Sequence, residues 1–213
     1  MEIFLDTAEI EDIRKYKDFI DGVTTNPSIM SKRGNDNPLD VIREICDTID
    51  GPISAEVLSE NYEDMLKEGK ALAAVHSNVC VKLPCTVDGL KTCKALSSEG
   101  IPTNLTLCFS PTQALIAAKC GATYVSPFIG RLDDIGQDGT ELIENIVDIY
   151  EVNGYETKVL AASVRGVQHV VQAAILGADA STLPVKILKQ CFEHPLTTTG
   201  LEQFSADWEN RKK

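Results

Sequence analysis

Two hydrophobic periods alternate along the chain. Short apolar runs rich in β-branched residues recur between longer segments whose apolar residues have helical spacing. The short runs predict eight strands, at residues 3–6, 22–25, 53–57, 79–83, 103–108, 123–127, 158–162 and 178–182. The longer segments predict a helix after every strand, at residues 9–17, 39–49, 62–75, 87–97, 111–119, 140–152, 167–176 and 184–191. The pattern therefore predicts eight consecutive βα units.

Eight βα units joined by right-handed crossovers close most naturally into a (β/α)8 barrel. The 213 residues lie near the short end of that fold's range, which begins at about 200 residues, so little length remains for another domain. A doubly wound sheet also shows this alternation, but it uses fewer strands and often has a glycine-rich first turn, which is missing here. We predict an α/β fold, a single-domain TIM barrel over residues 1–195.

One more helix is predicted at the end of the chain, over residues 196–213. Leu201, Phe204 and Trp208 form an apolar stripe at helical spacing. A stripe of this kind needs a surface to cover it, and the simplest expectation is the chain's own barrel.

Composition and charge narrow the class of protein. The chain is 43% hydrophobic and 24% charged, which allows a real core and argues against disorder. Its formal net charge of −12 argues against nucleic acid or an anionic membrane as the main partner. The seven cysteines include no C-x-x-C pair, and the sequence shows neither an export signal nor a long apolar run. We expect a soluble, cytoplasmic protein.

Polar residues close most of the predicted strands. In a (β/α)8 barrel the active site lies at the carboxyl ends of the strands, so these side chains are the candidates for function. In strand order they are Asp6, Thr24 with Asn26, Glu56, Lys82, Asn104 with Thr106, Ser126, and Ser163.

Lys82 has the most unusual predicted position. Val79, Val81 and Leu83 alternate toward the helices, so Cys80 and Lys82 point into the barrel. A buried ammonium is costly unless it is paired or loses its proton. Two interpretations stay open: an ion pair with a carboxylate across the barrel, or a desolvated amine that attacks a ketone or aldehyde to form a Schiff base.

Asp6 and Glu56 are the carboxylates that could move protons in such a reaction, or pair with the lysine. Asp6 has an alternative role as the N-cap of the helix that begins near Glu9. Asn26 precedes Pro27 and also has the pattern of an N-cap, which is compatible with ligand binding.

Two arginines follow strands six and seven. Arg131 and Arg165 would lie at the active-site end of the barrel, where guanidinium groups suit a sugar phosphate. From spacing alone, surface ion pairs with the aspartates at 133, 134 or 138 are an equal alternative. A zinc site is not expected, because His76, His169 and His194 are the only histidines and none closes a predicted strand.

Several segments together resemble the transaldolase family, in its short branch shared with fructose-6-phosphate aldolases. The matching segments cover nearly the whole chain in order: LDT at 5–7, GVTTNPS at 22–28, VKLP at 81–84, GIPTNLTL at 100–107, SPFIGR at 126–131 and AAS at 161–163. Val164 departs from the aromatic residue more common in the family.

The resemblance implies a class I aldolase mechanism without metal or organic cofactor. Lys82 would form the Schiff base, Asp6 would take the proton of the C4 hydroxyl, and Glu56 would act through a water held by Thr106. Asn26, Asn104 and Ser126 would hold the dihydroxyacetone unit, and Arg131, Ser163 and Arg165 would bind the phosphate. Thr24 and Phe128 would be further substrate-binding residues.

The implied reaction moves a dihydroxyacetone unit between sugar phosphates: sedoheptulose 7-phosphate and glyceraldehyde 3-phosphate give erythrose 4-phosphate and fructose 6-phosphate. Glu56 and Phe128 resemble transaldolase, since the aldolases have Gln and Tyr there. The alternatives are an aldolase that releases free dihydroxyacetone and a sugar-phosphate-binding barrel without turnover. The resemblance also implies a homo-oligomer, a pentamer or decamer, in which the C-terminal helix packs on a neighbouring subunit. For anionic substrates we expect Lys82, Arg131 and Arg165 to make one barrel mouth positive within an acidic protein.

Overall fold

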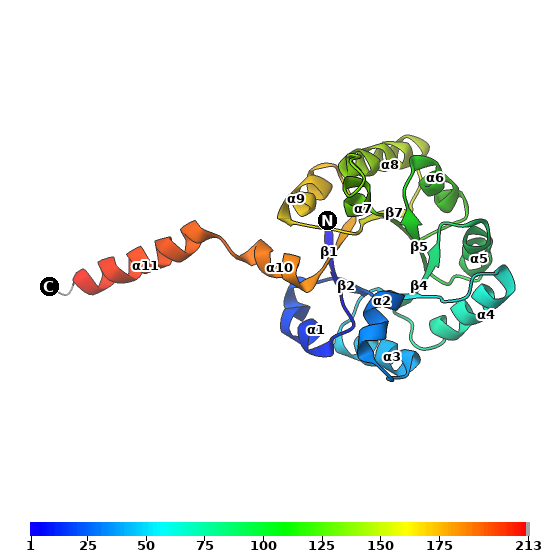
Figure 1. Cartoon of the computed structure of the whole chain (residues 1–213), viewed down its shortest axis with the longest axis horizontal. Helices are drawn as coiled ribbons and strands as arrows, with labels where there is room; N and C mark the ends of the chain where they lie inside the picture. Colours follow the sequence, from blue (N-terminus) through cyan, green and yellow to red (C-terminus); the bar gives the residue numbers. More distant parts are fainter. Residues whose placement is uncertain (212–213) are drawn as a thin grey trace.

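The computed structural model describes residues 1–211 and shows a closed barrel of eight parallel strands, adjacent in sequence order and ringed by helices (Figure 1). The strands are β1 (Glu2–Asp6), β2 (Gly22–Thr24), β3 (Ile53–Glu56), β4 (Val79–Pro84), β5 (Thr103–Cys108), β6 (Tyr124–Pro127), β7 (Lys158–Ala161) and β8 (Ala180–Leu183). The predicted TIM barrel is therefore confirmed, and each predicted strand lies within two residues of its observed bounds.

The eight predicted helices are also present. They are α1 (Ile10–Tyr16), α3 (Pro38–Thr48), α4 (Tyr62–Ala73), α5 (Val87–Ser98), α6 (Pro111–Lys119), α8 (Gly139–Asn153), α9 (Val167–Ile175) and α10 (Val185–Phe192). Two short 3-10 turns are also present, at Lys17–Phe19 directly after α1 and at Ser31–Arg33. No helix in the described part of the chain is long and apolar enough to cross a membrane.

The main core lies between the strands and the helices. On β4, Val79, Val81 and Leu83 are almost fully buried on the helix-facing side, as the alternation predicts. Cys80 lies on the inner side, where it packs with a small cluster that fills the amino-terminal half of the barrel. The same alternation places Lys82, two residues further on, at the carboxyl-terminal end of the barrel interior.

Two short helices in the loops at the carboxyl-terminal end were not predicted as separate elements. Helix α2 (Pro27–Met30) begins directly after β2, and the Asn26 side chain caps it by accepting a hydrogen bond from the Ile29 N–H at 2.9 Å. Pro27 occupies its first turn, so the predicted cap at Asn26 is confirmed.

Helix α7 (Ile129–Asp133) follows β6 and lies against the loop after β7. The Gly130 N–H donates to the Ser163 carbonyl at 3.1 Å. A Cβ atom at Gly130 would lie 2.1 Å from that oxygen, so only glycine permits this approach. The two loops that carry Arg131 and Arg165 are thereby held side by side.

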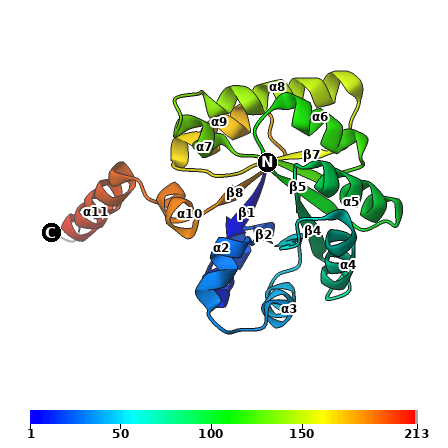
Figure 2. The same ribbon diagram turned by 45° about the vertical axis from the view of Figure 1, so that its right-hand side comes forward.

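The last helix, α11 (Pro195–Asn210), extends away from the barrel beyond α10 in both views (Figures 1 and 2). None of its residues is buried, and its apolar stripe is in solvent: Leu201 is 65% exposed, Phe204 73% and Trp208 61%. The expectation that this helix covers its own barrel is wrong, because no surface formed by residues 1–211 covers the stripe.

Candidate active site

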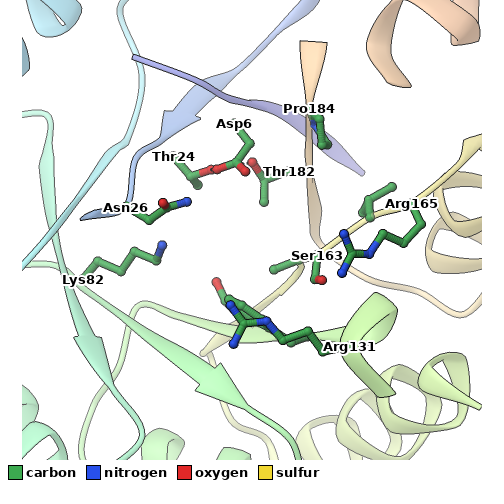
Figure 3. Close-up of a pocket in the computed structure, with 13 residues that line it drawn as sticks. Asp6, Thr24, Asn26, Lys82, Arg131, Ser163, Arg165, Thr182 and Pro184 are labelled. Atoms are coloured by element: carbon green, nitrogen blue, oxygen red, sulfur yellow. Dashed lines mark hydrogen bonds between the residues drawn. The ribbon is translucent and has the colours of Figure 1, made fainter. Parts of the chain in front are cut away.

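A cavity of about 200 Å³ opens at the carboxyl-terminal ends of the strands (Figure 3). Nine of the twelve predicted site residues line it: Asp6, Thr24, Asn26, Lys82, Ser126, Phe128, Arg131, Ser163 and Arg165. The remaining wall comes from the β7 loop and the end of β8. The prediction that the strand ends share one cavity therefore agrees with the structure for most of these residues.

Lys82 lies in this cavity with its charge compensated. Its Nζ lies 2.9 Å from Glu56 Oε2 and donates a hydrogen bond to the Thr25 carbonyl at 2.9 Å. Parallel register sets the first contact, because Glu56 on β3 is directly opposite Lys82 on β4. The lysine side chain is 6% exposed and the glutamate 13%. The ion pair left open by the sequence is thus present, and Figure 3 shows the amine directed into the cavity.

Asp6 lies at the end of β1 on the neighbouring part of the wall. Its Oδ1 accepts a hydrogen bond from the Thr24 hydroxyl at 2.7 Å. Burial raises the pKa of the Asp6 carboxyl, while the bond from Thr24 and the positive charge of Lys82 act in the opposite direction. Asp6 does not cap α1, whose N-cap is Glu9 without a side-chain bond. The alternative role of Asp6 as a helix cap is therefore wrong.

Thr182 on β8 extends this arrangement and was missed by the sequence analysis. Its Oγ1 lies 2.5 Å from the Thr24 Oγ1. A hydroxyl has one proton, so if Thr24 donates to an ionised Asp6, Thr182 must donate to Thr24. A signal was available: Thr182 is the last residue of the predicted strand eight and, like the predicted site residues on the other strands, a polar strand end.

Three predicted residues lie beside the cavity rather than on its wall. Glu56 contacts the cavity only through Lys82. Asn104 is fully buried; its amide donates to the Ser54 hydroxyl at 3.0 Å and accepts from Ser126 at 2.8 Å. Thr106 is also fully buried, and its hydroxyl has no hydrogen-bond partner among residues 1–211.

The position of Thr106 depends on a bulge that the sequence did not predict. Leu105 pairs with Val125 and Cys108 with Pro127, so Thr106 and Leu107 together face one residue of β6. Leu107 has φ of 56°, in the left-handed region that is uncommon for residues other than glycine. The bulge interrupts the ladder next to Thr106, beside the end of β4.

Two arginines and a serine form the far side of the cavity from Lys82 (Figure 3). Arg131 places its guanidinium carbon 5.0 Å from the centre of the Phe128 ring. Arg165 makes a 2.9 Å ion pair with Asp134, so the predicted surface pairing is present for this residue, although it also lines the cavity. Ser163 between them has φ of 59°.

The wall of the cavity carries three basic side chains, Lys82, Arg131 and Arg165, and one carboxylate, Asp6. The protein as a whole has a formal net charge of −12. Basic side chains thus outnumber carboxylates on the wall itself, while Glu56 and Asp134 beside it pair with Lys82 and Arg165. The expectation of a positive barrel mouth stays a prediction. The described residues contain no group of three or more histidine, cysteine or acidic side chains placed to hold a metal ion.

A second cavity, about 490 Å³ in volume, lies next to the site between α2 and helices α3 and α4. Met30, Leu39 and Ile42 contribute to its mainly apolar wall, and it reaches Asn26 and Glu56 from the other side. It does not reach Lys82 or the two arginines of the first cavity. The combination of an amine, a carboxylate and two arginines belongs to the smaller cavity.

Comparison with known proteins identifies relatives along the whole chain. The family model described as transaldolase/fructose-6-phosphate aldolase matches residues 3–213. A protein of Thermodesulfovibrio yellowstonii named probable transaldolase is 54% identical over the full length of both chains. Another of that name, from Sinorhizobium medicae, is 57% identical over 98% of this chain and 96% of its own. The chain belongs to the transaldolase/fructose-6-phosphate aldolase family.

Proposed function

We propose that the protein is a transaldolase that carries a dihydroxyacetone unit on Lys82 between sugar phosphates. The observation that carries the proposal is the buried Lys82 amine, 2.9 Å from the Glu56 carboxylate, in a cavity whose other side presents two arginines. The family match and the relatives named probable transaldolase support the same activity. Sedoheptulose 7-phosphate and glyceraldehyde 3-phosphate would give erythrose 4-phosphate and fructose 6-phosphate.

Substrate binding would use both sides of the cavity. Arg131, Ser163 and Arg165 would bind the terminal phosphate. Each guanidinium group is positively charged and can donate two hydrogen bonds to a phosphate, and the serine adds a hydroxyl. Asn26 lies on the side of the cavity near Lys82 (Figure 3), and Ser126 bonds to Asn104, which pairs with Lys82 in the sheet. Both would offer polar atoms to the hydroxyl groups of the dihydroxyacetone unit. Asn104 would support this contact from below, because it fixes the Ser126 hydroxyl.

Formation of the Schiff base requires a neutral amine. Glu56 is the acidic partner of the Lys82 ammonium and would accept its proton before Nζ attacks the C2 carbonyl. The carbinolamine then loses its hydroxyl as water, with a proton returned from Glu56. The buried Thr106 hydroxyl is free to hold the water through which that proton moves.

Cleavage of the C3–C4 bond needs a base at the C4 hydroxyl, and Asp6 would fill this role. As Asp6 takes the hydroxyl proton, the C4–O bond becomes a carbonyl and the C3–C4 electron pair moves into the protonated imine. The products are an aldehyde and an enamine bound to Lys82. Attack of the enamine on the acceptor aldehyde reverses these steps and returns the proton from Asp6.

Phe128 favours transfer over release of dihydroxyacetone. Its ring lines the cavity, packs edge-on against Phe109 at 5.7 Å between centroids, and carries no hydroxyl that could protonate the enamine. An enamine that is not protonated persists until an acceptor arrives. This favours the transaldolase over the aldolase that releases the three-carbon unit.

We also infer a homo-oligomer of cytoplasmic subunits, a pentamer or decamer. In each subunit, residues 1–195 form the catalytic barrel and α11 packs on a neighbour. Residues 212 and 213 of the helix predicted at 196–213 lie outside the described residues. The exposed apolar stripe of α11 supports this inference. Burial of its three large apolar side chains against a neighbouring subunit would be favourable, whereas in the single chain they stay in contact with water. All seven cysteines are free, which suits a reducing compartment.

Borohydride reduction with fructose 6-phosphate tests the Schiff base. We expect mass spectrometry to find a reduced dihydroxyacetone adduct on Lys82, and Lys82→Met to lose the adduct and at least about a thousandfold in kcat. Lys91→Met is the matched control, since Lys91 follows on α5 with a 62% exposed side chain. An unmodified Lys82 in the active wild-type protein would contradict the Schiff-base mechanism.

The pH dependence of kcat/KM tests Asp6. The base acts in its ionised form, and burial raises its pKa above 3.8, so the acid limb should lie above the ordinary aspartate range. Thr24→Val removes a hydrogen bond that stabilises the ionised form, so the limb should move further up, whereas Thr24→Ser should restore it. Asp6→Asn should lower kcat about 10²–10⁴-fold. If the acid limb of the pH profile does not move in Thr24→Val, Asp6 is not the base.

Phe128→Tyr tests the preference for transfer. A phenol at this position can protonate the enamine, so release of free dihydroxyacetone from fructose 6-phosphate without an acceptor should rise about tenfold or more. A coupled assay with and without erythrose 4-phosphate measures transfer and cleavage separately. Phe192→Tyr, on α10 and half exposed, controls for the added hydroxyl. No increase in release would refute the assigned role of Phe128.

The oligomer is tested by changing the stripe of α11. Replacement of Leu201, Phe204 and Trp208 by serine, or deletion of residues 196–213, should reduce the mass measured by light scattering to that of a smaller assembly. Gln203→Ser with Asn210→Ser alters the opposite side of the same helix and should leave the mass unchanged. An unchanged mass in the stripe variant would show that α11 does not hold the subunits together.

A further inference from the structure

His169 lies outside the cavity on α9, where its side chain is 16% exposed. The sequence analysis gave it no role. In the structure it contacts both segments that carry the arginines of the cavity. Its Nδ1 accepts a hydrogen bond from the Arg165 backbone N–H at 3.2 Å, and its Nε2 lies 2.8 Å from Asp133 Oδ2.

We propose that His169 is a positioning residue for phosphate binding, which joins the loop of Arg165 to the helix of Arg131. The inference rests on the proposed function, because it assigns the cause of phosphate affinity at the same site. His169 itself does not touch the cavity, so its effect passes through the backbone of Arg165 and through Asp133.

The hydrogen bonds fix one form of the imidazole ring. Because Nδ1 accepts from a backbone N–H, it carries no proton. The proton of the neutral ring therefore sits on Nε2, which donates it to Asp133. Asp133 is two residues beyond Arg131 on α7, and its other oxygen accepts from the Gly139 N–H at 2.9 Å. The ring thus bridges the two segments, and its two contacts fix its orientation.

The loop after β7 needs such external support. Ser163 adopts φ of 59°, a left-handed conformation that a serine holds only when surrounding contacts impose it. Below the loop, the Gly130 N–H bonds to the Ser163 carbonyl. Among the described residues, the Arg165 side chain has one ion-pair partner, Asp134, and both partners are more than half exposed. The His169 side chain is less exposed, at 16%, and its hydrogen bond holds the Arg165 backbone itself.

Loss of the bridge should affect one end of the cavity. Lys82 is held by Glu56 and the Thr25 carbonyl, which belong to β3 and the end of β2, on the other side of the barrel from α9. The binding of a phosphate group should therefore weaken, while Schiff-base formation with a ligand that has no phosphate should not. This difference separates a positioning role from general destabilisation.

The experiment measures borohydride trapping on Lys82 against ligand concentration for two ligands, fructose 6-phosphate and dihydroxyacetone. In His169→Leu, the half-saturating concentration of fructose 6-phosphate should rise about tenfold, the effect of about one lost hydrogen bond. The value for dihydroxyacetone should stay within about twofold. His169→Asn keeps an oxygen near the Nδ1 position for the Arg165 N–H but does not reach Asp133, so its value should fall between wild type and His169→Leu.

His76→Leu is the matched control. His76 Nδ1 also accepts a backbone N–H, from Asn78 at 3.1 Å, but it precedes β4 at the amino-terminal end of the barrel. Neither half-saturating concentration should change in this variant. If His169→Leu does not fold, His169→Asn carries the test through its own selective rise for fructose 6-phosphate.

Two outcomes overturn the inference: an unchanged value for fructose 6-phosphate in the His169 variants, or an equal rise for both ligands. A wild-type protein that forms no adduct with either ligand would instead refute the proposed function. The two failures can be told apart, because the first requires that the wild-type protein forms the borohydride-reduced adduct on Lys82.

Discussion

A lysine inside a barrel must have its charge compensated, and in this protein one carboxylate does so. Transfer of an ammonium from water into the 6% exposed position of Lys82 is costly, and the removal of Glu56 alone would leave that charge buried without a counter-ion. The pair forms because β3 and β4 are neighbours in register, so that the two residues are opposite each other. In the proposed mechanism the same carboxylate accepts the proton that the amine loses before it attacks a carbonyl. One ion pair would then serve both the stability of the folded chain and its chemistry.

The two sides of the cavity are built from different kinds of structure. Lys82, Asp6 and Thr24 stand on strands, where ladder hydrogen bonds and core packing fix the backbone. Arg131 and Arg165 stand on a five-residue helix and a loop, whose positions depend on contacts between the two segments. Bond-making groups tolerate little displacement, whereas a phosphate group accepts donors over a wider range of directions. The groups that need the more exact positions therefore lie on the strands, which are the more rigid elements.

The sequence predicted the barrel because its signals are local and repeated: strand alternation, helical spacing and turn residues all indicate the same eight units. Alternation also gave the correct side for Lys82. Alternation predicts the side of the sheet on which a side chain lies, but not how far it lies from the cavity. It therefore did not predict that Asn104 lies beneath the cavity wall, with its amide hydrogen-bonded to Ser54 and Ser126. The bulge at Leu107 has no sequence signal, since a leucine rarely adopts positive φ. Likewise the stripe on α11 shows that a surface must cover it, but not which molecule provides that surface.

The hydroxyl pair of Thr24 and Thr182 also bears on stereochemistry. Thr24 holds one oxygen of Asp6, which prevents free rotation of the carboxylate and leaves its second oxygen as the base. In the proposed mechanism, a substrate held at Lys82 and at the two arginines would present its C4 hydroxyl to that oxygen in only one configuration. In the reverse direction, the incoming aldehyde would receive its proton from the same side. Two threonines on the strands next to β1 would thereby help to determine the handedness of the newly formed carbon centre.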